Sequence, residues 1–169
     1  MENNERILKE YGKQIASYSK LTYSEAKDLY TKYVNTEDSK EKKKYMDELI
    51  LGTLYVVYKY IKEKDVLMFC TRDYDANDII SAFNETWIRR LHDGALLKAT
   101  CYSAILYKPT FINKVYESLG GQSVDLPAIC KLNIKQFTEL LMKYLKAEYN
   151  GENFSYYSEI AKELGENVD

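Results

Sequence analysis

Carboxylates near the starts of two predicted helices are the side chains of this sequence that come closest to an acid–base set. Glu25, Asp28, Asp75 and Asp78 could act as a general acid and a general base if the fold brought them together. Helix capping explains Glu25, Asp75 and Asp78 more simply, because each stands at the start of an apolar helical pattern. The sequence has a single histidine, His92, and neither a phosphate-binding glycine loop nor a paired nucleophile and base. These features predict a protein that is not an enzyme and that needs no cofactor.

The sulfur and imidazole side chains do not form a metal-binding pattern. Cys70, Cys101 and Cys130 are odd in number and far apart, which predicts buried reduced thiols rather than metal ligands or a disulfide framework. His92 stands beside Asp93 near a predicted helix end, so we expect it on the surface. No metal site is predicted.

The charge of the chain is nearly balanced overall but uneven along its length. A net charge of −2 over 169 residues argues against a protein that simply coats nucleic acid. Between residues 86 and 119, in a segment rich in aromatic side chains, positive residues exceed acidic ones. The positive residues are Arg89, Arg90, Lys98, Lys108 and Lys114, and the acidic ones are Asp93 and Glu117. The sequence therefore allows a local basic face.

The elements that must position these side chains are predicted to be helices throughout. Two prolines and seven glycines interrupt long stretches in which apolar residues recur at helical spacing. We predict an all-α fold, with a helical bundle over residues 1–119 and a smaller helical unit over 120–169 that begins with a linker at 120–123. The predicted helices cover residues 5–19, 22–35, 40–62, 75–91, 95–106, 111–118 and 126–149, with a last helix around 159–165.

The predicted helix over residues 75–91 has the clearest start and stop. Asp75 can accept hydrogen bonds from the first turn, and Asp78 adds negative charge at the positive end of the helix dipole. Gly94 stands where a helix stop belongs, and Pro109 is expected to interrupt the next helix. The apolar stripe of this helix consists of Ile80, Phe83, Trp87 and Leu91.

Four features of this sequence, taken in order, resemble the bacterial RNA polymerase sigma factor family. Residues 21–29, with Leu21-Thr22 and Glu25, are similar to the family's early Leu-Thr-x-x-Glu helix. Residues 47–57 are similar to its Leu-Ile helix that ends in Val-Val, and residues 75–91 resemble its second-region helix, which opens on Asp-Leu-Ile. The Leu-Pro at 126–127 and the Glu-Ile-Ala-Lys-Glu-Leu-Gly at 159–165 resemble its third region. The family's domain that reads the upstream promoter element lies outside this sequence, and the sequence leaves open whether the chain is a fragment or a natural short form.

The resemblance implies a fold of the sigma second-region type that docks on the clamp coiled coil of the RNA polymerase core. Carried over to this sequence, the polymerase-binding residues are Asp78, Ile79, Ile80 and Asn84. The Gln-Glu pair that follows in the family is Ser81-Ala82 here. An anti-sigma protein is a further partner that the resemblance implies.

The segment over residues 98–108 falls where the family melts promoter DNA and binds the non-template single strand. Stacking on an aromatic ring offsets the cost of unpairing a base, and nearby cations hold the phosphates. The resemblance implies that Lys98, Thr100, Tyr102 and Lys108 contact promoter DNA, with Tyr102 stacking on a flipped base. The family's tryptophan pair is replaced by Ile105-Leu106.

A second interpretation stays open beside transcription initiation by a sigma-like subunit. The acidic net charge and the 17 tyrosines also fit a helical adaptor, of phage or plasmid type, that binds polymerase or a regulator without touching DNA. A basic, aromatic-lined groove around residues 98–114, with salt-dependent affinity for single-stranded DNA, would distinguish the first interpretation. No apolar run reaches the roughly 18 residues of a membrane span, so we expect a cytoplasmic protein without a membrane partner.

Overall fold

The computed structural model describes residues 2–64 and 75–119, and all the regular elements in these two stretches are helices. The prediction of an all-α protein is therefore confirmed. The predicted linker, the helices beyond residue 119, Cys70 and Cys130 lie outside the described residues. The helices are α1 Glu2–Ile15, α2 Tyr23–Asn35, α3 Ser39–Glu63, α4 Ala76–His92, α5 Ala95–Lys98, α6 Tyr102–Leu106 and α7 Pro109–Ser118.

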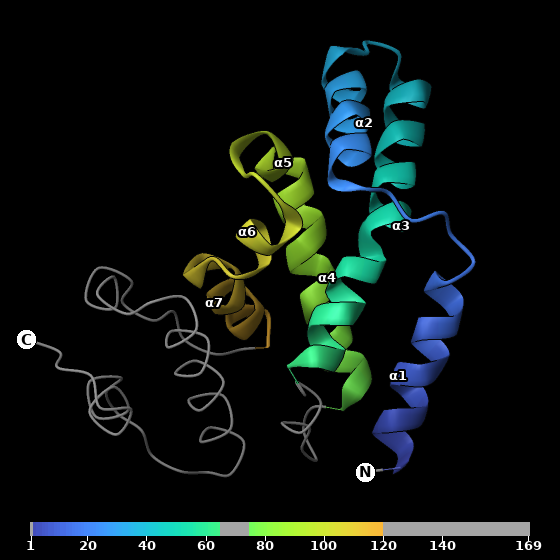
Figure 1. Cartoon of the computed structure of the whole chain (residues 1–169), viewed down its shortest axis with the longest axis vertical. Coiled ribbons are helices and arrows are strands. Elements are labelled where there is room, and N and C mark those ends of the chain that lie inside the picture. Colours follow the sequence, from blue (N-terminus) through green and yellow to red (C-terminus); the bar gives the residue numbers. More distant parts are fainter. Residues whose placement is uncertain (1, 65–74, 120–169) are drawn as a thin grey trace, which may run out of the picture.

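The long helix α3 organises the bundle. Its first half pairs with α2 through a short turn, and its second half packs against α1 and α4 (Figure 1). The three short helices α5, α6 and α7 lie along α4 on the side away from α1 (Figure 1). None of the described helices combines the length and the apolarity needed to cross a membrane.

The stripe predicted for residues 75–91 forms the centre of the core. Ile80, Phe83, Trp87 and Leu91 are all buried, and Trp87 is the largest side chain with no exposed surface. Phe83 and Trp87 both contact the ring of Phe111 from α7, at centroid distances of 6.2 and 6.5 Å. The apolar residues of α4 therefore pack against α7 as well as against α3.

The helix caps expected at Glu25, Asp75 and Asp78 are present, in both helices as a reciprocal capping box. The N–H of Glu25 donates to Thr22 Oγ1 (3.2 Å), and the N–H of Thr22 donates back to Glu25 Oε2 (2.8 Å). At the start of α4 the N–H of Asp78 donates to Asp75 Oδ1 (3.1 Å), and the N–H of Asp75 donates to Asp78 Oδ2 (2.9 Å). The hydrogen bonds between Thr22 and Glu25 lower the pKa of the Glu25 carboxyl group. Three of the four carboxylates considered as an acid–base set therefore cap helices.

The helix predicted over residues 95–106 is wrong as a single element. It is divided into α5 and α6, because Ala99 and Cys101 are extended, with ψ angles of 172° and 169°. The phenol of Tyr23 explains the break, since its Oη donates to the carbonyl oxygens of Leu96 (2.6 Å) and Ala99 (2.8 Å). A tyrosine from α2 thus partners carbonyl groups at the end of α5, and the chain turns away.

Two further predictions near this break need correction. Cys101 is exposed, not buried, because it lies at the turn where α6 begins. Pro109 begins α7 and does not merely end the preceding helix. Proline suits the first position of a helix, where its fixed φ is already helical and no N–H is needed. His92 is exposed, as predicted.

Two glycines are required by the geometry around them. Gly94 has a φ of +76°, the left-handed conformation that ends many helices, and this confirms the predicted stop after α4. Gly52 lies in the middle of α3, where a Cβ atom would stand 2.6 Å from Leu21 Cδ1. The segment before α2 therefore crosses α3 in close contact, and the N–H of Leu21 donates to Gly52 O (3.0 Å).

Candidate nucleic-acid and polymerase interface

The four polymerase-binding residues implied by the resemblance divide into two groups on α4. Ile79 and Ile80 are 0% and 5% exposed, so their side chains build the core and present no surface to a partner. Asp78 is exposed in the first turn, where it completes the capping box. Asn84 is half-buried, and its Oδ1 accepts a hydrogen bond from Tyr11 Oη (2.9 Å). Two of the four residues are therefore placed at or near the surface.

A stripe of polar side chains runs along the exposed face of α4 from Asp78. Ser81, Glu85 and Arg89 follow at spacings of three, four and four residues and are all exposed, and Arg89 pairs with Glu85. Ala82, which aligns with the glutamate of the family pattern, is only 5% exposed, so this position offers little access to water. A carboxylate at residue 82 would lose water without gaining a partner. We call Asp78, Ser81, Glu85 and Arg89 the α4 stripe.

Tyr102 is fixed within the bundle. Its Oη lies 2.8 Å from Leu21 O and 3.0 Å from Thr22 O, so the hydroxyl donates to the backbone at the start of α2. Its ring meets the rings of Tyr23, Tyr55 and Trp87 edge to face, at centroid distances of 5.2, 6.3 and 6.0 Å. Burial raises the pKa of this phenol above its ordinary value.

These contacts change the role implied for Tyr102. Stacking on a flipped base needs a free ring face, and the neighbouring aromatic side chains and the two carbonyl groups hold this ring in place. In this conformation the residue joins α6 to α2. Thr100, in contrast, is exposed in the turn between α5 and α6.

Lys98 and Lys108, the two lysines that the resemblance implies bind DNA, line the same hollow. Lys98 and Lys108 line a hollow of about 70 Å³ together with Arg90 from α4, and Asp93, Ala95 and Ile105 complete its wall. Lys98 Nζ lies 3.3 Å from the carbonyl oxygen of Asp93. We call the side chains of Arg90, Lys98 and Lys108 the cationic hollow.

The cationic hollow carries a surplus of positive charge. In the described part of the chain, Arg90, Lys98 and Lys108 form no ion pair, whereas Arg89 pairs with Glu85 and Lys114 pairs with Glu117. Three cations and the single carboxylate of Asp93 are thus the charged residues that line the hollow, and guanidinium and ammonium groups are the usual partners of phosphate. The sequence gives no reason to group Arg90 with these two lysines, because only the turn between α4 and α5 brings it to Lys98.

A larger hollow of about 660 Å³ lies between the first half of α3 and the segment before α2. Lys40, Lys43 and Lys44 line it, but Asp47 and Glu48 follow one turn later on the same helix. Because the two signs of charge nearly balance, this hollow lacks the field that a polyanion requires. Of these two hollows, the cationic hollow has the larger surplus of positive charge.

Among residues 2–64 and 75–119, no cluster of three or more His, Cys, Asp or Glu side chains could hold a metal ion. No protein-family model, no curated protein and no solved structure matches this chain. The α4 stripe and the cationic hollow are therefore the candidate sites of this chain.

Proposed function

We propose that this protein is a sigma-like transcription initiation subunit that binds bacterial core RNA polymerase through the α4 stripe and single-stranded promoter DNA through the cationic hollow. The observation that carries the proposal is the meeting of Lys98 and Lys108 with Arg90 directly after α4. Of the four features that resemble the sigma family, the first three correspond to parts of α2, α3 and α4 in one bundle. DNA is held mainly by its phosphates, because Tyr102 is engaged with α2.

The helical adaptor is the second candidate. The enclosure of Tyr102 favours it, since an adaptor needs no ring to stack on a base. The surplus of cations in the hollow favours the sigma-like subunit, since an adaptor that never meets DNA has no use for it. Measurements of polymerase binding and of DNA binding therefore separate the two functions.

The α4 stripe is tested by removing one charge. We expect Asp78→Asn to weaken binding to bacterial core RNA polymerase by about tenfold, because a charge-assisted contact contributes about 1.5–3 kcal/mol. Asparagine keeps an acceptor oxygen for the N–H of Asp75, so the cap is largely preserved. Binding is measured by the change in fluorescence anisotropy of labelled protein titrated with core polymerase.

Asp75→Asn is the matched control for this substitution. It removes the same charge from the same capping box, and asparagine is an equally good N-cap residue. We expect this variant to bind polymerase like the wild type. Equal weakening in both variants would assign the effect to the start of α4 as a whole, and no weakening in Asp78→Asn would remove this residue from the interface.

The cationic hollow is tested by salt dependence. The double variant Lys98→Gln/Lys108→Gln should bind single-stranded promoter DNA less tightly than the wild type at low salt. Each neutralised phosphate contact lowers the slope of log K against log salt by about 0.7, so the slope should fall by about 1.4. The measurement is a titration of fluorescent oligonucleotide at several salt concentrations.

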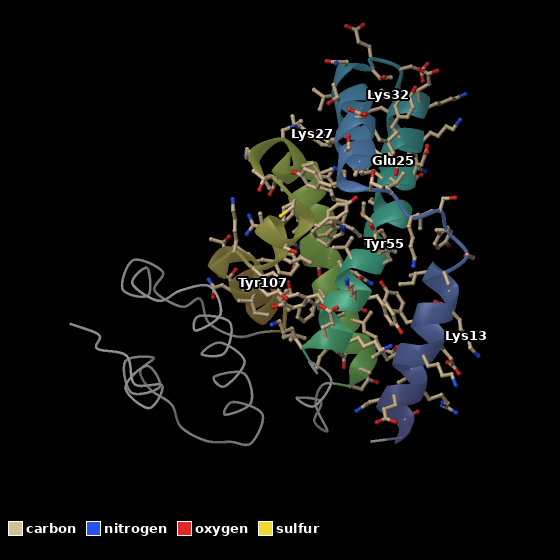
Figure 2. The ribbon with its side chains drawn as sticks, in the orientation of Figure 1. Lys13, Glu25, Lys27, Lys32, Tyr55 and Tyr107 are labelled. Carbon is tan, nitrogen blue, oxygen red and sulfur yellow. The ribbon has the colours of Figure 1, made fainter. Side chains whose placement is uncertain are left out.

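Lys9→Gln/Lys13→Gln is the control for this loss of charge. Both lysines are exposed on α1, and Lys13 lies on the opposite side of the bundle from Tyr107, the neighbour of Lys108 (Figure 2). The control should keep the wild-type slope. Polymerase binding without any salt-dependent DNA binding would support the adaptor.

A further inference from the structure

Helix α1 is held to the bundle by a narrow apolar edge. Of its described side chains only Ile15 is buried, while Ile7, Leu8 and Tyr11 are partly buried against the core. Gly12 allows close approach, since a Cβ atom there would stand 2.7 Å from Tyr58 Oη of α3. The helix lies beside the second half of α3 and the first half of α4 (Figure 1).

The hydroxyl of Tyr11 makes a specific contact within this edge. Tyr11 Oη donates to Asn84 Oδ1 at 2.9 Å, and its ring meets the ring of Tyr58 at a centroid distance of 6.1 Å. Burial raises the pKa of Tyr11, so the phenol stays a donor throughout the neutral range. Asn84 lies beside the α4 stripe. It is one of the residues that the resemblance implies bind polymerase. One of the two acceptor positions of its amide oxygen is thus already used within the chain.

The chain after α1 is anchored independently of α1. The N–H of Leu21 donates to Gly52 O (3.0 Å), and its carbonyl oxygen accepts from Tyr55 Oη (2.8 Å). Residues 19–22 are not helical and join α1 to this anchor. Movement of α1 away from α4 therefore does not require α2 to move.

We infer that α1 is an autoinhibitory helix that covers the Asn84 edge of the polymerase-binding face. The inference rests on the proposed function of α4 in polymerase binding. Polymerase and α1 compete for Asn84, so the affinity of the free protein is reduced by the fraction of molecules in which α1 is docked. A substitution that increases the fraction of molecules with α1 undocked increases the affinity for polymerase in proportion to that fraction.

Two substitutions in the full-length chain lift α1 by different means. Gly12→Leu places a side chain where the ring of Tyr58 stands, and Tyr11→Phe removes the hydrogen bond to Asn84 but keeps the ring. We expect affinity for core RNA polymerase to rise about fivefold in Tyr11→Phe, the factor that one net hydrogen bond provides, and further in Gly12→Leu. Gln14→Leu adds the same leucine on the exposed face of α1 and should bind like the wild type.

Binding titrations and amide hydrogen exchange decide the outcome. Exchange of the α1 amides should become faster in Gly12→Leu and in the wild-type complex with polymerase, while the amides of α3 stay protected. Equal affinity of wild type and both lifted variants would overturn the inference and leave the proposed function intact. Weaker binding by the lifted variants would overturn it by making α1 part of the interface. If neither the wild type nor any variant binds polymerase, the proposed function fails and this inference fails with it.

Discussion

Replacing Trp87 with alanine is expected to lower the free energy of unfolding by about 3–5 kcal/mol, the usual cost of truncating a fully buried aromatic side chain. Trp87 is the largest of the fully buried residues and lies against the rings of Tyr102 and Phe111. Its Nε1–H donates to Thr53 Oγ1 at 2.9 Å, which joins α4 to α3 inside the core. Because a domain is stabilised by only about 5–15 kcal/mol in total, much of the population should unfold at modest urea concentrations. Urea unfolding followed by far-ultraviolet circular dichroism measures the loss.

Trp87→Phe and Thr53→Val separate packing from hydrogen bonding at this site. Phenylalanine keeps most of the ring, so we expect a smaller loss than with alanine. Valine has the shape of threonine but leaves the indole N–H buried without its acceptor, at a cost of about 1–3 kcal/mol. In the double variant the two effects should be less than additive, because both remove the same bond. A loss below about 1 kcal/mol in Trp87→Ala would contradict the central place of this residue in the core.

The features that the sequence predicts correctly are those that depend on residues close together in the chain. The caps at Thr22 and Asp75, the stop at Gly94 and the stripe of α4 depend on residues within a few positions of each other, and all are present in the structure. The division between α5 and α6 depends on Tyr23, which is more than 70 residues away in the chain. Local periodicity contains no information on such a contact, so the single helix predicted there was wrong.

The candidate site shows the same division. Lys98 and Lys108 were selected by resemblance, and the structure places them together, but Arg90 joins them only through the turn between α4 and α5. Ile79 and Ile80 match the residue types of the family pattern, but both side chains are buried in the core. The hydrogen bond from Tyr11 to Asn84 links residues 73 positions apart, and no pattern in the sequence indicates it. The sequence thus shows which residue types are present. Which of these side chains a partner can reach depends on how the helices pack.

Tyr102→Ala should also destabilise the fold, by about 2–4 kcal/mol, because a ring packed among three aromatic neighbours is lost. Tyr102→Phe should cost only about 1 kcal/mol, since it removes one hydroxyl donor. The carbonyl oxygen of Leu21 keeps its bond from Tyr55, and that of Thr22 keeps its bond from the N–H of Ala26. Thermal and urea unfolding of the two variants measure this difference.

The alkaline range gives an independent check on the same phenol. Burial raises the pKa of Tyr102 above that of an unfolded tyrosine, so the stabilisation is complete below about pH 10 and is lost as the pH rises toward the folded value. Tyr102→Phe should therefore lose less stability than the wild type between neutral pH and pH 11. Identical alkaline profiles would show that the phenol is not held as the structure places it.

Single-stranded DNA binding by the same two variants decides whether Tyr102 acts on DNA or only on the fold. If the ring stays between α2 and α4, both variants should bind promoter DNA like the wild type at a temperature where each is folded. If the ring leaves its site to stack on a base, alanine should lose about 1–3 kcal/mol of binding free energy. Phenylalanine would then bind at least as tightly as tyrosine, because it stacks equally well and gives up fewer bonds on release. The two hydrogen bonds to α2 and the three surrounding rings favour the first result, which would leave the cationic hollow as the main DNA contact of this protein.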